Sequence, residues 1–574
     1  MQFRYCLRYM ILQMCGLGLF WPSAMYMVSA QSVVGQLAGL GVGGPYDAVA
    51  TQDGGQVLCG IFTGILDLDP GPGTTVVSCP GGLAAWVAKY DDAGELAWGF
   101  ALGNSGDVSA RGLVEDEHGH LHVVGYFNGV VDLDPGVGVV NVTSAGDWDI
   151  WYLELAADGS FARGGRIGGA DRQYPTDIAC DGDGSIWLAG ILKGPADMDP
   201  GPGTFMLTGS TDNNAFIARY DLMGGVQWAY PLPGVPYMAV DGTTGNIYLT
   251  TGSQTDAMTT QDLDPGSGTL SPLSPGDPAA DYMALLKLDA NGDLLWARVQ
   301  RGHADLNAWD NQGLALAVDA LGDVYWAGTF LNDFNAYPGN DLTLDAPGTS
   351  SDGFLVKYNG NGALIWEKRF GAANAFDHCS DVLLDDQGNI WVAGSFQGLA
   401  ELNSAGPSVQ VLSAGGYDVF VAAFLPSGGL LWHGAVGGMG NEGTPQLTEA
   451  VNGMRLSGFF SNSADLDPTP MVSTLTAQNT DPFLVTFQPT WMTFLGREDC
   501  ALQFQVFPIP CNGVLHVAGL PADALLELQD PTGRVVWEGK VHGPIDLTGH
   551  SGGIYWLRAT HHDRLVAVPV MVAH

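Results

Sequence analysis

The chain has 574 residues, of which only 14% are charged, yet 61 Asp and Glu residues outnumber 21 Lys and Arg residues and give a net charge of −40. This excess argues against nucleic-acid binding, because phosphate contacts need Lys and Arg, and against adsorption on anionic lipid surfaces. It fits a soluble extracellular protein or one that gathers cations. The 82 glycines predict many turns, and the aromatic and β-branched residues between them favour strands.

The first thirty residues have the pattern of a secretory signal peptide. Arg4 and Arg8 precede an apolar run from about Met10 to Val28, and the small residues VSA before Gln31 resemble a cleavage site. A membrane anchor is the alternative, but no basic stop-transfer flank follows, and no other stretch is long and apolar enough to span a bilayer. We therefore predict that residues 1–30 are removed on export and that the mature protein has no membrane-spanning segment.

An acidic corner, first met as ILDLDPGPGT over residues 65–74, recurs along the chain. Near copies follow at steps of 65 residues, and degraded copies follow at similar steps; the seven copies start at Asp67, Asp132, Asp197, Asp262, Asp333, Glu401 and Asp465. Each copy lies between two strand–turn–strand hairpins, and no segment shows sustained helical periodicity. Two hairpins make a four-stranded antiparallel unit that buries too little apolar surface to be stable alone. Seven units stacked around an axis predict an all-β fold, a seven-bladed β-propeller over residues 32–490.

Two features predict how the blades join. The run SVVGQLAGLG over residues 32–41 resembles the last strand of a unit, and we expect it to pair with the weakly ending seventh blade and close the ring. A tryptophan recurs just after the second turn of most units, and we expect it to pack between blades, with a ligand-stacking platform as the alternative. These residues are Trp98, Trp228, Trp296, Trp366 and Trp432, with Phe161 in the second unit.

With this corner and these hairpins, the units resemble the SBBP family of bacterial β-propeller repeats, whose blades often carry the Asp-x-Asp-Pro-Gly corner. The stretches GNIWVAG and GDVYWAG are also similar to NHL-type blades. The resemblance covers about residues 32–496 and implies the propeller fold. It implies little about activity.

The acidic corner has two interpretations. Residues two apart share a face of an extended chain, so the two carboxylates of a corner project together, and Ca²⁺ takes six to eight such oxygen ligands. Alternatively, the carboxylates accept hydrogen bonds from the backbone two residues on, and Pro-Gly presets a tight turn. The corner lacks the terminal Glu of an EF-hand, and the structural turn is the favoured interpretation. In the calcium interpretation, the only one that implies a cofactor, the candidate ligands are Asp67, Asp69, Asp132, Asp134, Asp197, Asp199, Asp262, Asp264, Asp465 and Asp467.

After a linker over residues 491–503 the repeat stops, and residues 504–574 predict a small Ig-like β-sandwich. Its blocks FQVFPIPCNGVLHV, LELQDPTGRVVWEG and PIDLTGHSGGIYWLRA resemble the type A C-terminal sorting domain of the type IX secretion system of the Bacteroidota. The family's motif residues fall on Pro508, Pro510, Asp530, Gly533, Arg534, Gly553, Ile554 and Tyr555. Two departures are Ile509, where the family usually has Asn, and the missing terminal Lys. The resemblance implies passage through the periplasm, recognition by the type IX machinery, and release or attachment at the outer cell surface.

The sequence contains no HExxH motif and no phosphate loop. In EHGHLHVVG, His120 and His122 share a strand face, which permits a metal site, but with His118 they flank a predicted hairpin tip, and we expect surface histidines. In an oxidising compartment Cys59–Cys79 and Cys500–Cys511 are candidate disulfides because each pair is close in sequence.

We therefore predict a secreted or surface-displayed binding module whose ligand is a glycan, a polymer or a protein. The alternative is an extracellular hydrolase or lyase whose active site is assembled in the propeller funnel from several blades. The aromatic hairpin ends are also similar to the tryptophan-docking repeats of quinoprotein dehydrogenases, but those enzymes usually have eight blades and a vicinal Cys pair, and the sequence shows neither.

Overall fold

The computed structural model describes residues 33–39, 41–103, 106–209, 214–253, 261–271, 282–301, 311–331, 333–334, 344–346, 350–372, 375–404, 408–451, 453–469 and 471–488, and parts of 505–572. The predicted signal peptide lies outside these residues. The chain divides into two compact units, Met1–Met492 and Thr493–His574. Every regular element of the described residues is a strand, and among them no helix long and apolar enough to cross a membrane occurs.

The first unit consists of groups of four antiparallel strands that are hydrogen-bonded in chain order. The first three groups are β2 (Gly43–Ala50), β3 (Gln56–Asp67), β4 (Val76–Tyr90) and β5 (Leu96–Leu102); β6 (Val108–Glu115), β7 (Leu121–Phe127), β10 (Asp149–Leu155) and β11 (Phe161–Gly169); and β12 (Gln173–Cys180), β13 (Ile186–Leu192), β16 (Ala215–Tyr220) and β17 (Val226–Leu232).

The next three groups repeat this order. They are β18 (Tyr237–Val240), β19 (Ile247–Ser253), β20 (Tyr282–Leu288) and β21 (Leu294–Arg301); β22 (Gln312–Val318), β23 (Val324–Phe330), β26 (Asp352–Tyr358) and β27 (Leu364–Phe370); and β28 (His378–Leu384), β29 (Ile390–Glu401), β30 (Gln410–Phe424) and β31 (Leu430–Gly438). The last group takes β32 (Gly443–Ala450), β33 (Gly453–Asp465) and β34 (Thr474–Phe487) from the end of the repeats, and β1 (Val33–Gln36) from their start.

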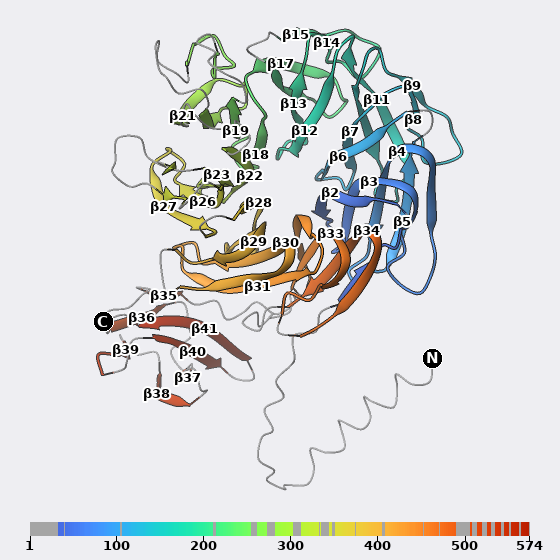
Figure 1. The fold of residues 1–574 in the computed structure, drawn as a ribbon. Helices are drawn as coiled ribbons and strands as arrows, with labels where there is room; N and C mark the ends of the chain where they lie inside the picture. Colours follow the sequence, from blue (N-terminus) through green and yellow to red (C-terminus); the bar gives the residue numbers. More distant parts are fainter. Residues whose placement is uncertain are drawn as a thin grey trace. The chain divides into compact units, whose positions relative to one another are not determined.

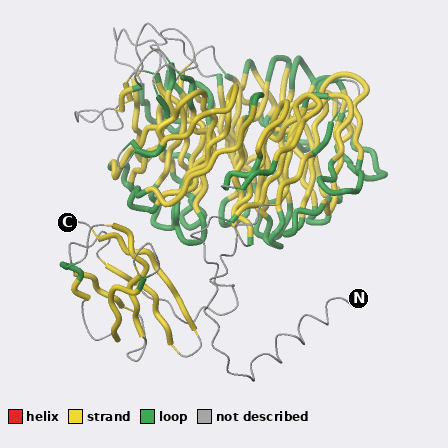
Figure 2. The backbone as a smooth tube through the Cα atoms, turned by 60° about the horizontal axis from the view of Figure 1, so that its bottom comes forward, coloured by secondary structure: helices red, strands yellow, loops and turns green. Residues whose placement is uncertain are grey.

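The first strands of the groups contact one another in a closed series: β2 lies beside β6, followed by β12, β18, β22, β28 and β32, and β32 lies beside β2. Figure 1 shows these first strands nearest to a common centre, and Figure 2 shows the strands running between two faces formed by loops. The absence of helices among the described residues and the many antiparallel sheets are consistent with a β-propeller, as the repeat predicts.

The start and end of the repeats are joined by β1. It pairs antiparallel with β34 from Val33 opposite Thr486 to Gln36 opposite Phe483. The Gln36 side chain also donates from Nε2 to Asp481 Oδ2 at 2.6 Å. The spare N-terminal strand therefore occupies the outer position of the last group and covers the edge of β34.

Tryptophans of the outer strands pack against the following group. Trp98 of β5 donates from Nε1 to the carbonyl of Ala157 at 3.3 Å, and Trp296 of β21 donates to the carbonyl of Gly360 at 3.1 Å. Trp366 makes the same contact with Pro426 at 3.0 Å. The prediction that these residues pack between neighbouring units is confirmed for all three.

Two cysteine expectations have different outcomes. Cys59 and Cys79 are both free thiols, so the expected disulfide between them is wrong. The register explains this: Cys59 of β3 faces Val87 of β4, whereas Cys79 faces Gly64, five residues further along β3. Cys500 and Cys511 lie outside the described residues.

The second unit contains two sheets in its described residues. One has the order β35 (Gln505–Phe507), β36 (Val514–Ala518) and β39 (Ile545–Asp546), and the other has the order β38 (Val535–Lys540), β37 (Leu525–Gln529), β40 (Gly553–His561) and β41 (Arg564–Val572). They share a core that includes Leu515, Leu526, Leu557 and Val570. This unit is all-β, as predicted; the finer assignment of an Ig-like sandwich remains a prediction.

Candidate functional site: a pocket lined by arginine and aromatic residues

The carboxylates of the acidic corners accept hydrogen bonds from the backbone of the same corner. In the first corner, Asp67 Oδ1 accepts hydrogen bonds from the backbone N–H of Asp69 at 3.1 Å and of Thr75 at 2.7 Å, and Asp69 Oδ1 accepts one from Gly71 at 2.8 Å. The same three bonds recur with the pairs Asp132 and Asp134, Asp197 and Asp199, Asp262 and Asp264, and Asp465 and Asp467. Each corner is therefore a turn in which both side chains replace missing backbone acceptors.

Four corners, those at Asp67, Asp197, Glu401 and Asp465, also attach their group to the group before it. The short hairpin of β14 (Pro195–Asp197) and β15 (Met206–Thr208) pairs with β11, with Asp197 opposite Gly168. Asp67 donates its backbone N–H to the carbonyl of Ala38, which follows β1 of the last group. Asp465 lies opposite Gly437 of β31, at the end of the preceding group. The apolar residue in the middle of each corner is buried wherever it is described: Leu68, Leu133, Met198, Leu263, Phe334, Leu402 and Leu466. The recurring corner therefore connects neighbouring sheets at several places in the ring.

No set of three or more His, Cys, Asp or Glu side chains placed to hold a metal ion occurs among the residues that the structure describes. The calcium interpretation of the corners stays a prediction. Of the predicted sorting residues, Pro508, Pro510, Asp530 and Gly533 lie outside the described residues. Gly553 and Ile554 begin β40, Tyr555 is buried in the core of the second unit, and Arg534 is exposed.

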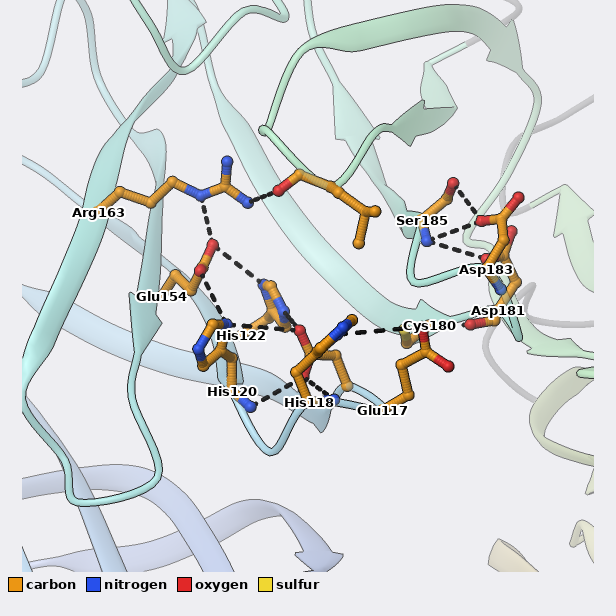
Figure 3. A network of polar contacts seen from close by, with 12 residues as sticks. Glu117, His118, His120, His122, Glu154, Arg163, Cys180, Asp181, Asp183 and Ser185 are labelled. Carbon is orange, nitrogen blue, oxygen red and sulfur yellow. Dashed lines mark hydrogen bonds and ion pairs between the residues drawn. The ribbon is translucent and has the colours of Figure 1, made fainter.

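The histidine stretch differs from the expectation of surface residues (Figure 3). His118 is exposed and His120 is half-buried, but the side chain of His122 is only 3% exposed because β7 is covered on both faces. Its Nδ1 lies 2.8 Å from Tyr152 Oη, and its Nε2 lies 3.3 Å from Asp116 Oδ2. Burial lowers the pKa of His122, against the opposing effect of Glu154 and Asp116. The expectation is therefore wrong for His122, which is a buried, hydrogen-bonded residue.

Three carboxyl groups on first strands connect neighbouring groups at the centre of the ring. Asp47 Oδ2 accepts from the backbone N–H of Leu113 at 2.8 Å, Asp177 Oδ2 accepts from Met238 at 2.7 Å, and Asp381 Oδ2 accepts from Leu447 at 2.6 Å. Each acceptor lies in one group and each donor in the next. These residues recur at one position of the repeat, in YDAV, TDIA and SDVL, and this recurrence is the sequence signal that would have identified them.

The same carboxyl groups predict a pH-dependent stability. The three residues are half-buried, and the surrounding protein displaces bulk solvent from their carboxyl groups, so burial raises the pKa of Asp47 to about 8, of Asp177 to about 7 and of Asp381 to about 6. In the unfolded chain an Asp carboxyl has a pKa of about 3.9. Folding therefore favours the protonated form, and its contribution to stability is complete below about pH 4 and is lost as the pH rises through 6 to 8.

We expect the melting temperature of the mature protein to fall between pH 5 and pH 9, and to fall less in the Asp47→Asn variant. Calorimetry or circular dichroism across this range measures both slopes. Glu95→Gln, which changes an exposed carboxylate, should keep the wild-type slope. Because burial also raises the pKa of Asp377 to about 7 and of Glu442 to about 8, part of the slope should remain in the variant. Equal slopes in wild type and Asp47→Asn would contradict the assignment.

A pocket of about 470 Å³ lies beside these carboxyl groups and is lined by the first strands of several groups. We call it the axial pocket; its side chains include Tyr46, Arg111, Tyr126, Trp148, Arg172, Tyr174, Thr176, Tyr237 and Gln312. Small-ligand pockets span about 300–1,000 Å³ and combine apolar walls with a few polar groups, so the axial pocket has the size and lining of a binding site.

Bulges in the first strands place several of these side chains. The register of β2 on β3 shifts between Pro45 and Asp47, leaving Tyr46 as the extra residue. The register of β6 on β7 shifts between Ala110 and Gly112, which leaves Arg111 as an extra residue. A third shift, in β12 on β13, leaves Thr176 as an extra residue. A bulge re-aims the side chain of the unpaired residue. All three bulged residues line the axial pocket.

The aromatic rings of the axial pocket form one wall around Arg111. The Arg111 guanidinium carbon lies 3.9 Å from the ring centroid of Tyr46 and 5.1 Å from that of Tyr126, and its Nη2 donates to Tyr126 Oη at 3.0 Å. The Tyr126 ring lies 4.3 Å from the ring of Trp148 and 6.1 Å, edge-on, from that of Tyr174. The pocket therefore presents a cation held between aromatic faces. Its residues come from separate repeats, so no local sequence pattern predicts the pocket.

No family model matches the chain. Over 500 residues it is 20% identical to an uncharacterized WD repeat-containing protein of Acanthamoeba polyphaga mimivirus, covering 74% of this chain and 34% of that protein. Over 147 residues it is 29% identical to the regulatory protein FlaEY of Caulobacter vibrioides, covering 25% of this chain and 14% of that protein. The matches thus span about a third or less of these relatives.

Solved structures with some similarity include a protein of unknown function from Dyadobacter fermentans, at 12% identity and a TM-score of 0.33 over 80% of this chain and all of that one. The quinohemoprotein alcohol dehydrogenase of Comamonas testosteroni has 10% identity and a TM-score of 0.36 over 84% and 78% of the two chains. PorZ of Porphyromonas gingivalis, a surface component of the type IX secretion system, has 10% identity and a TM-score of 0.17 over 94% and 100%. Scores this low establish no shared function.

Proposed function

We propose that this chain is a secreted or cell-surface binding protein, a seven-bladed β-propeller that takes its ligand in the axial pocket. The observation that carries the proposal is the pocket itself: a cavity of about 470 Å³ at the centre of the ring, walled by tyrosine and tryptophan rings and containing two arginines. The closed series of first strands and the β1–β34 pairing support the seven-bladed ring. A glycan, with its flat sugar faces and many hydroxyl groups, suits this lining best among the predicted ligands.

The test of the axial pocket is a glycan-array screen of the mature chain, followed by calorimetric titration of the best ligand. We expect Trp148→Ala and Tyr237→Ala to weaken binding at least tenfold, because each removes a face of the wall. Phe376→Ala, which removes an exposed aromatic ring elsewhere, should bind as the wild type does. Wild-type affinity in both pocket variants would place the site elsewhere, and cleavage of the bound glycan would favour the hydrolase or lyase alternative.

We further propose that the second unit directs export through the type IX machinery, on the support of the signal-peptide pattern and the sorting motifs. Deleting residues 504–574 should trap the protein in the periplasm of a host that has this system. Cell fractionation and immunoblotting measure the distribution. Replacement of the exposed Arg534 by Ala, which leaves the core of the second unit intact, separates recognition from folding. Appearance of the truncated chain in the medium would show that the sorting assignment is wrong.

A further inference from the structure

We propose that the ligand of the axial pocket is an acidic saccharide whose carboxylate group is bound by Arg111. This inference rests on the proposed function, since it requires that the pocket binds a ligand, and it adds the chemical class of that ligand. Four features of the described structure carry it: the absence of a carboxylate partner for Arg111, the way its guanidinium is held, the surrounding rings, and the state of the nearby aspartates.

Arg111 differs from the other arginines that the described part of the ring contains. Most of them pair with carboxylates: Arg163 with Glu154, Arg166 with Asp149, Arg172 with Asp147, Arg219 with Asp181 and Asp183, and Arg369 with Asp352. Arg298 and Arg455 donate to backbone carbonyls. Arg111 has no carboxylate within ion-pair distance among the described residues, although the protein carries a net charge of −40. A lone cation in an acidic protein indicates an anionic partner that binds from outside.

The guanidinium of Arg111 is held in place before a ligand arrives. Its central carbon lies over the rings of Tyr46 and Tyr126, and the hydrogen bond to Tyr126 Oη uses one of its five N–H donors. The other four donors have no acceptor among the described residues. A planar guanidinium with free donors binds a carboxylate through two parallel hydrogen bonds, and prior orientation reduces the entropy lost on binding.

The surroundings favour a saccharide over a small inorganic anion. The rings of Tyr126, Trp148 and Tyr174 line the axial pocket next to the guanidinium and supply apolar surface for a sugar ring. The Thr176 hydroxyl donates to the carbonyl of Pro236, and its oxygen can still accept a hydrogen bond from a sugar hydroxyl. An inorganic anion needs no such wall. A sugar ring with a carboxylate uses both the rings and the cation.

Nearby aspartates do not cancel the charge of Arg111. Asp47 and Asp177 follow the bulged pocket residues Tyr46 and Thr176 in sequence, but the oxygens of both accept backbone N–H groups. Burial raises the pKa of Asp47 to about 8 and of Asp177 to about 7, so their negative charge is reduced at neutral pH. This reduction also lowers the repulsion that an anionic ligand would meet.

The test compares trigalacturonic acid with its methyl ester, which keeps the sugar rings and removes the charge, by calorimetric titration of the mature chain. We expect the acid to bind at least tenfold more tightly than the ester, and Arg111→Met to remove this difference. Arg111→Lys keeps the positive charge but lacks the planar guanidinium with its paired donors, so this variant should retain part of the difference in affinity between acid and ester. Arg298→Met, which changes an arginine outside the axial pocket, should leave the difference in affinity unchanged. Thermal melting of each variant verifies that it is folded.

The remaining outcomes separate this inference from the proposed function. If the acid and the ester bind with equal affinity, and Tyr237→Ala weakens the binding of both, the inference is overturned. The axial pocket would then remain the binding site. A glycan array carrying uronates, sialylated sugars and sulfated sugars widens the test. Binding to another carboxylated sugar that is lost in Arg111→Met supports the inference. Binding to sulfated sugars only, or to no acidic sugar at all, overturns it.

Discussion

Deletion of residues 33–39 is expected to abolish the cooperative unfolding of the mature protein and to cause aggregation. This segment contributes β1, whose backbone pairs with β34 at four positions, and Leu37, which is 1% exposed in the core with Leu58 and Phe62 of the first group. Four net hydrogen bonds and one buried leucine amount to about 5 kcal/mol. A domain is stable by only about 5–15 kcal/mol, and the deletion also exposes the edge of β34.

Light scattering and thermal melting of the purified variant measure this effect. A synthetic peptide of residues 33–39, added in trans, should restore part of the melting transition, because it offers the same strand to β34. A peptide of the same composition in scrambled order is the matched control. If the deleted protein melts as a monomer at the wild-type temperature, β1 does not hold the ring together.

The second large effect is expected for Gly159→Ala, in the turn that packs against Trp98. Gly159 has a φ of 80°, and a methyl group there would lie 2.8 Å from the Trp98 ring. The left-handed backbone costs about 1–2 kcal/mol for a residue with a Cβ, and overpacking against the ring adds about 1–3 kcal/mol. Urea unfolding should therefore show a loss of about 2–5 kcal/mol.

The chain contains a matched control for this substitution. Gly94 occupies the corresponding turn of the first group with a φ of 81°, but no atom lies within 4 Å of a methyl group built there. Its preceding outer strand is β1, whose residues Val33–Gln36 include no tryptophan. Gly94→Ala should therefore lose only the backbone part, about 1–2 kcal/mol. Equal losses in the two variants would show that packing of the tryptophan between groups contributes nothing measurable.

The sequence predicted the all-β, antiparallel character of the fold because its evidence is local and repeated. A strand–turn–strand pattern needs only neighbouring residues, and the corner at Asp67, Asp132, Asp197 and Asp262 marks each repeat at a constant step. The same locality explains two errors. His122 was assigned to a hairpin tip, yet its strand is covered on both faces, and the proximity of Cys59 to Cys79 in sequence said nothing about which residues face each other across β3 and β4.

By itself, then, the sequence determined the all-β repeat, the acidic corner as a turn and the N-terminal strand that pairs with the last group, because turn chemistry and periodicity act within one repeat. Only the tertiary structure determined which residues form the axial pocket. Tyr46, Arg111, Trp148 and Tyr237 belong to different repeats, and no local pattern relates them. They meet because strand bulges and the closed ring of sheets bring them to one centre, where Arg111 has no carboxylate partner among the described residues although the protein carries a net charge of −40.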